Sequence, residues 1–70
     1  MLVKMRTELD KDADAAYIYL KDKIEEGEVA MTISVNENII LDFDSNNKLI
    51  GIEVLDASKN LSKLPQKLAA

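Results

Sequence analysis

N-I-I-L-D-F-D-S-N-N-K-L-I-G-I-E-V-L, residues 38–55, is the stretch that decides the fold. Its two apolar segments flank Asn46-Asn47, a pattern that is typical of two strands joined by a tight turn. Asparagine tolerates the positive φ that a two-residue hairpin turn requires at both central positions. With these asparagines at the centre of the turn, three apolar pairs face one another: Phe43 with Ile50, Leu41 with Ile52, and Ile39 with Val54. A shift by one residue would break all three pairs, because side chains alternate between the two faces of a sheet.

The chain has 70 residues, enough for one small domain, and it contains no cysteine and no histidine. A domain of this size buries only about 60% of the surface that its unfolded chain exposes, so it is marginally stable by itself. Disulfides cannot add stability, and the usual zinc, iron–sulfur and haem ligands are missing. We therefore expect no cofactor and a homodimer, since association with a second chain is the remaining source of stability.

The formal net charge is -4, with thirteen acidic and nine basic residues. This balance argues against nucleic-acid binding, which depends on lysine and arginine beside phosphates. No apolar run is long enough to span a membrane, and residues 1–4 lack the apolar core of a signal peptide. We expect a cytoplasmic protein whose acidic body suits a basic partner.

Three further segments carry strand or helix patterns. Residues 3–9 alternate between apolar and polar side chains, which predicts a half-buried strand. Residues 15–20 fit two interpretations from pattern alone, a helix with Asp12 as N-cap or a strand that pairs back onto residues 3–9. The strand interpretation places Leu9 opposite Ala16, Thr7 opposite Ile18, Met5 opposite Leu20, Arg6 opposite Tyr19, and Glu8 opposite Tyr17. Residues 29–44 form either one long bent strand or two strands with a turn near residues 36–38, because the alternation does not change there.

The C-terminal part predicts a short helical element. Asp56 is a suitable N-cap for a helical turn over residues 57–61, and Pro65 should break any longer helix near residues 63–64. We therefore expect one antiparallel β domain over residues 1–60 and a short helical or frayed tail over residues 61–70.

One motif resembles a calcium-binding loop. Its candidate metal ligands are Asp42, Asp44, Asn46 and Glu53, at the spacing of an EF-hand loop. Asn47 stands where such a loop takes its glycine, and the flanking segments predict strands rather than the helices of an EF-hand. A solvated hairpin turn is the simpler interpretation, with metal or ligand binding by residues 42–53 as the alternative.

No catalytic residues can be assigned, because the serines have no histidine to activate them. We therefore expect no enzymatic activity. Tyr17 and Tyr19 suit a protein interface, where tyrosine is enriched. Apolar residues on the second face of the central hairpin extend this predicted interface: Ile40, Leu49 and Leu55.

Three segments resemble the domain-of-unknown-function family 2283 of small bacterial and archaeal proteins: D-K-D-A-D-A-A-Y-I-Y-L at residues 10–20, N-E-N-I-I-L-D-F-D at residues 36–44, and L-I-G-I-E-V-L-D-A-S-K at residues 49–59. The chain departs from the family pattern at Lys11, where proline is frequent, and at Asn47, where glycine is usual. The resemblance implies a strand at residues 15–20. It also implies an antitoxin-type role, because some relatives are paired with small toxin-like proteins.

Residues and resemblance together predict a mainly β (α+β) fold, a small antiparallel sheet of about four strands in hairpins with a short C-terminal helix. The leading functional hypothesis is a homo-oligomeric protein-interaction module of antitoxin type.

Overall fold

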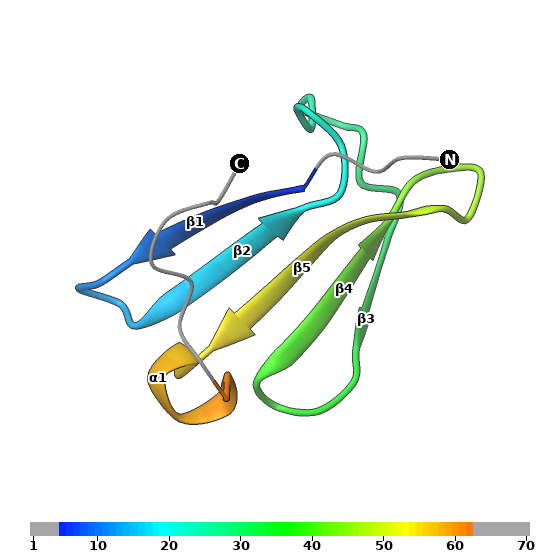
Figure 1. Ribbon diagram of the computed structural model, residues 1–70. Coiled ribbons are helices and arrows are strands. Elements are labelled where there is room, and N and C mark those ends of the chain that lie inside the picture. The colour runs from blue at the N-terminus through cyan, green and yellow to red at the C-terminus, as the bar shows by residue number, and fades with distance from the viewer. Residues whose placement is uncertain (1–4, 63–70) are drawn as a thin grey trace.

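The computed structural model describes residues 5–62, which form an antiparallel sheet and one turn of helix (Figure 1). The elements, in chain order, are β1 (Arg6–Asp10), β2 (Ala15–Tyr19), β3 (Met31–Ser34), β4 (Ile39–Phe43), β5 (Leu49–Leu55) and α1 (Ala57–Asn60). The strand order across the sheet is β1-β2-β5-β4-β3, so the last strand of the chain lies at the centre. The predicted mainly β fold with a short C-terminal helix is confirmed, with five strands in place of about four.

The additional strand comes from residues 29–44, which form two strands rather than one. β3 and β4 pair with each other, and the backbone N–H of Val35 donates to the carbonyl of Ile39 at 2.8 Å. The Asn36 side chain stabilises the turn, because its Oδ1 accepts hydrogen bonds from the backbone N–H groups of Asn38 and Ile39 at 2.7 and 2.9 Å. A side-chain acceptor of this kind favours a turn over continued extension.

The first hairpin has the predicted register, with Arg6 opposite Tyr19 and Leu9 opposite Ala16. Residues 15–19 are therefore a strand, and the helix interpretation is wrong. The connecting loop is stabilised by the Asp10 carboxylate, which accepts the backbone N–H groups of Asp12 and Ala13. Pairing with β5 on its other edge makes β2 an interior strand of the sheet.

The central hairpin differs from the prediction at its turn. Phe43 lies opposite Leu49 and not Ile50. Asn47 has a φ of 64°, whereas Asn46 is not among the residues with positive φ. The loop therefore contains three residues, 45–47, in the arrangement where a turn is followed by one left-handed residue.

The observed loop is one residue longer than the predicted one, which shifts the pairing of β4 with β5. A bulge in β5 then restores the predicted register. The pairing changes between Asp42 and Phe43, and the additional residue on β5 is Ile50. Beyond this bulge, Leu41 lies opposite Ile52 and Ile39 opposite Val54, as predicted. The carbonyl of Ile50 accepts the N–H of Leu20 at 3.0 Å, so the bulged residue remains hydrogen-bonded to the sheet.

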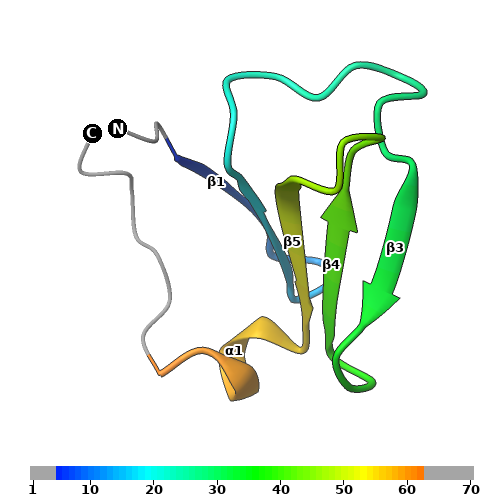
Figure 2. The same ribbon diagram turned by 90° about the vertical axis from the view of Figure 1, so that its right-hand side faces the viewer.

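The helix α1 packs on β2 and β5 at one end of the sheet (Figure 2). Its buried residue Ala57 forms a small core with Ala16 and Val54, and Leu9, Ile52 and Leu61 pack against them. Asp56 occupies the predicted N-cap position but makes no side-chain cap hydrogen bond.

Asp14, in the loop of the first hairpin, caps the helix instead. Its carboxylate accepts the backbone N–H of Ser58 at 3.1 Å and the Ser58 hydroxyl at 2.7 Å. Its carbonyl accepts the N–H of Ala57 at 2.8 Å. A loop distant in sequence therefore fixes the helix against the sheet. The predicted break near residues 63–64 and the rest of the tail lie outside the described residues.

The cross-strand pairs divide the strand side chains between two faces, since directly opposite residues lie on the same face. The face that contacts α1, here called the apolar face, carries Thr7, Leu9, Ala16, Ile18, Met31, Ile33, Ile39, Leu41, Phe43, Ile52 and Val54. The other, here called the tyrosine face, carries Arg6, Glu8, Asp10, Ala15, Tyr17, Tyr19, Thr32, Ser34, Ile40, Asp42, Gly51, Glu53 and Leu55. Among residues 5–62, no helix is long and apolar enough to cross a membrane.

Candidate protein-interaction surface

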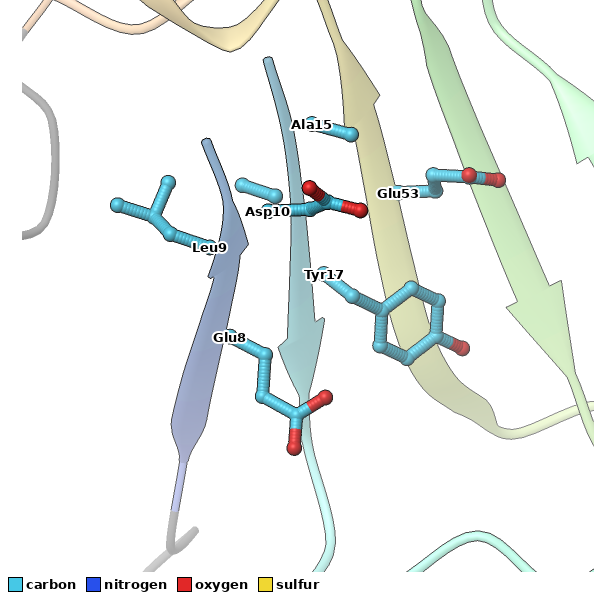
Figure 3. Close-up of a pocket in the computed structure, with 7 residues that line it drawn as sticks. Glu8, Leu9, Asp10, Ala15, Tyr17 and Glu53 are labelled. Carbon is cyan, nitrogen blue, oxygen red and sulfur yellow. The ribbon is translucent and has the colours of Figure 1, made fainter. Parts of the chain in front are cut away.

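The tyrosine face is built around Tyr17, which projects from β2 opposite Glu53 of β5. Its ring extends over β5 toward β4 (Figure 3), and its hydroxyl donates a 2.7 Å hydrogen bond to Oδ2 of Asp42 on β4. The other oxygen of the same carboxylate accepts the Thr32 hydroxyl of β3 at 2.9 Å. Side-chain contacts on the tyrosine face thus connect β2 with β4 and β3, and they pass over β5.

Gly51 makes this arrangement sterically possible. A Cβ atom added at Gly51 would lie 1.9 Å from the Tyr17 hydroxyl oxygen and 2.5 Å from Cζ of the ring. Any other residue at this position would push the ring away from Asp42. The φ of Gly51 is not in the left-handed region, so the glycine is required for the close approach of the ring and not for a special backbone conformation.

Burial raises the pKa of the Tyr17 phenol above its ordinary value of 10.0, and the hydrogen bond to Asp42 raises it further. The ionised phenolate would lose hydration and would face a carboxylate, so the protonated donor is favoured. Tyr17 is therefore a hydrogen-bond donor with a fixed direction at neutral pH.

Tyr19 is held by a second group of contacts toward the β1 edge. The guanidinium carbon of Arg6 lies 3.9 Å from the centre of its ring, and its hydroxyl donates to Oε1 of Glu8 at 3.1 Å. Arg6 also pairs with Oε2 of Glu8 at 2.7 Å. The rings of Tyr17 and Tyr19 meet edge to face, with centres 4.8 Å apart and an interplanar angle of 69°. Both rings are thus positioned by packing as well as by hydrogen bonds.

A hollow of about 280 Å³ lies beside the Tyr17 ring (Figure 3). The carboxylates of Glu8, Asp10 and Glu53 are among its lining groups. Glu53 has no hydrogen bond or ion pair with any other residue that the structure describes. The strand residues of the tyrosine face include four acids, Glu8, Asp10, Asp42 and Glu53, and one base, Arg6. This surface therefore combines ordered aromatic rings with an excess of negative charge.

The candidate metal ligands do not meet at one point. Asp42 and Glu53 lie on the tyrosine face, where Asp42 already binds Tyr17 and Thr32. Asp44 lies in the hairpin turn, where its Oδ1 accepts the backbone N–H groups of Asn46 and Lys48 at 2.8 and 3.0 Å. Within residues 5–62, no group of three or more acidic, histidine or cysteine side chains is arranged to hold a metal ion.

The turn hydrogen bonds also explain the acidity of Asp44. Donation from the N–H of Lys48, with a further contribution from the N–H of Asn46, lowers the pKa of this carboxyl below its ordinary value of 3.8. The acceptor role of Asp44 is thus a structural one, since it stabilises the turn.

The structure separates the apolar residues that the sequence assigned to the interface with Tyr17 and Tyr19. Ile40 is opposite Glu53 and Leu55 is opposite Ala15, so both lie on the tyrosine face. Leu49 is opposite Phe43, because the bulge moves it to the side of the apolar face. Gly51 was not predicted to have a role, although a glycine within a strand pattern is a signal of close approach.

Residues 6–58 match the family described as Protein of unknown function (DUF2283). The chain belongs to this family. The match begins at the first residue of β1 and ends at Ser58, the residue of α1 that Asp14 caps. It therefore includes every residue of the tyrosine face and the helix cap of this DUF2283 protein. No curated protein and no solved structure matches the chain.

Proposed function

We propose that the protein is a non-catalytic protein-interaction module that acts as a homo-oligomer and binds a partner through the tyrosine face. The observation that carries this proposal is the pair of tyrosine rings held by carboxylates, Tyr17 by Asp42 and Tyr19 by Glu8, on a half-buried surface. Tyrosine contributes a large contact area to interfaces and loses little conformational entropy on binding. Rings that are already positioned lose still less, which favours affinity.

The charge of the surface favours a basic partner. The hollow beside Tyr17 is lined by three carboxylates, and Glu53 among them makes no ion pair with the described part of the chain. A lysine or arginine side chain of a partner fits such a site, where its aliphatic stem can pack on the ring and its charge can meet Glu53. Complementary charge also accelerates association and selects against acidic partners.

A small basic toxin-like protein is the partner that we propose, with this protein as its neutralising member. The support is the family resemblance together with the acidic surface. A sequence without cysteine or histidine also supports a role in binding over a role in catalysis. The proposal includes the cytoplasmic location expected from the sequence.

The test is binding to the product of the adjacent gene. We expect a complex by titration calorimetry whose affinity falls as the salt concentration rises, because exposed ionic contacts are screened. Glu53→Lys should weaken binding at least tenfold, since it reverses the charge beside Tyr17. Glu26→Lys is the matched control, because it makes the same change at an exposed position in the connection between β2 and β3. Absence of binding at low salt, or equal loss in both variants, would refute the proposal.

The neutralising role needs a second measurement, in cells. Expression of the adjacent gene product alone should slow growth, and co-expression of this protein should restore it. Glu53→Lys should restore growth less than Glu26→Lys does. If the adjacent product does not affect growth, the antitoxin role is excluded and binding alone remains.

A further inference from the structure

The apolar face of the sheet is largely uncovered by the described part of the chain. Within residues 5–62, four apolar residues are buried, Ala16, Ile50, Val54 and Ala57, and three of them form the small core beneath α1. Beyond this core the face opens toward β3, where Met31 and Ile33 are 42% and 43% exposed. Figure 2 shows the sheet as one layer, with α1 at one end only.

The same face is hollowed at the end away from α1. A cavity of about 490 Å³ is lined there by apolar side chains, Met5, Leu20, Leu49 and Ile50, with charged loop residues around them. Isolated exposed apolar side chains are common on proteins, but a continuous apolar surface that includes a cavity marks a contact site.

We infer that a second copy of this chain covers the apolar face, so that two sheets stack into a two-layered sandwich. This inference rests on the homo-oligomer in the proposed function and identifies the face through which the two copies associate. Sheets stacked face to face lie about 10 Å apart with interlocked side chains, an arrangement that a bare apolar face of this kind can form.

The charge distribution selects this face for self-association. None of the strand residues on the apolar face is charged, and the charged loop residues around its cavity include both signs, Lys21, Asp44 and Lys48. Two acidic chains can therefore meet there without opposing a set of like charges. On the tyrosine face, four acids and one base would oppose the same set in a symmetric dimer, which is unfavourable. The two faces thus suit different occupants, a second copy on one and a basic partner on the other.

The test compares charges introduced at neighbouring positions of β3. The unaltered chain should sediment at twice 7.8 kDa at micromolar concentration. Ile33→Asp places a charge on the apolar face and should weaken dimerisation at least tenfold. Ser34→Asp places the same charge on the tyrosine face and should leave the dimer intact. A monomer at all concentrations would overturn the inference, as would equal effects of the two variants.

A cross-linking experiment covers the case in which Ile33→Asp does not fold. The natural chain has no cysteine, so single cysteines can be compared at Leu41 on the apolar face and Ile40 on the tyrosine face. A flexible bis-maleimide should give a covalent dimer with Leu41→Cys and little with Ile40→Cys. The reverse result would overturn the inference.

Partner binding by these variants separates this inference from the proposed function. A dimer that does not bind the adjacent gene product would leave the inference intact and refute the proposed function. A monomer that binds the product, and whose binding is lost in Glu53→Lys, would refute the inference and the homo-oligomer on which it rests, and would leave partner binding through the tyrosine face intact.

Discussion

The two faces of the sheet are made by the same five strands, yet they are stabilised by different interactions. On the tyrosine face, Tyr17 and Tyr19 are held by hydrogen bonds to carboxylates within the chain. On the apolar face, the residues beneath α1 are buried and those toward β3 remain exposed. The comparison shows that a polar face can be ordered by contacts among its own side chains, whereas an apolar face is stabilised only by exclusion of water.

Truncation of adjacent residues on β5 gives the sharpest contrast between the faces. Val54 is 3% exposed, and Val54→Ala removes two buried methyl groups and leaves a cavity. We expect a loss of about 2 kcal/mol in the free energy of unfolding. Glu53→Ala, on the tyrosine face, should change it by less than about 0.5 kcal/mol. Urea unfolding measures both, and a similar loss in the two variants would contradict the division into faces.

Gly51→Ala should break the order of the tyrosine face. Because the new Cβ would overlap the Tyr17 ring, the ring must leave Asp42, and we expect a loss of about 1–2 kcal/mol. In a Tyr17→Ala background the overlap is absent, and Gly51→Ala should become neutral or stabilising, since glycine is unfavourable within a strand. Thermal unfolding of the four proteins provides the cycle. An equal loss of stability in both backgrounds would show that the Tyr17 ring is not the reason why position 51 requires glycine.

Tyr17→Phe removes only the hydroxyl that donates to Asp42 and retains the ring. We expect a loss of about 1 kcal/mol at neutral pH. Burial and the hydrogen bond to Asp42 raise the pKa of Tyr17 in the folded state. The contribution of Tyr17 to stability is therefore complete below about pH 10, the ordinary phenol pKa, and is lost as the pH rises through the folded-state pKa. Between these two pKa values, only the unfolded chain has released the proton.

The measurement for Tyr17→Phe is urea unfolding at pH 8 and at pH 11. The natural chain should lose more stability between these two pH values than the variant does. Equal losses would mean that Tyr17 is not the group responsible.

The sequence predicted the strands and most of the register because alternation of side chains is a local signal. The predicted pairs that lie within β1 and β2 were correct, since Leu9 opposite Ala16 satisfies the alternation of both strands. The division of residues 29–44 was not predictable, because the Asn36 turn preserves the alternation on either side. The capping of α1 by Asp14 was also inaccessible, since that contact joins residues 44 positions apart.

The candidate site was predicted in part. The sequence placed Tyr17 and Tyr19 on one face with Glu8 and Arg6, and the structure agrees. It did not predict the contact of Tyr17 with Asp42, because these residues are on strands that do not pair and the ring must cross a third strand. It also assigned Leu49 to this face, since a bulge that inserts one residue has no clear signal in the alternation.

The turn that produces this bulge gives the smallest predicted effect. Asp44→Asn keeps the shape of the side chain but removes the charge that accepts the N–H groups of Asn46 and Lys48. The folded-state pKa of Asp44 is lowered, so its contribution to stability is present above its ordinary pKa of 3.8 and is lost as the pH falls through the folded value. We expect a small decrease in the melting temperature at pH 7 that disappears once acid protonates this carboxyl in the folded state, with Ser45→Ala in the same turn as the control. If the decrease persists in acid, the charge of Asp44 does not hold the three-residue loop, and another interaction must place Leu49 on the side of the apolar face.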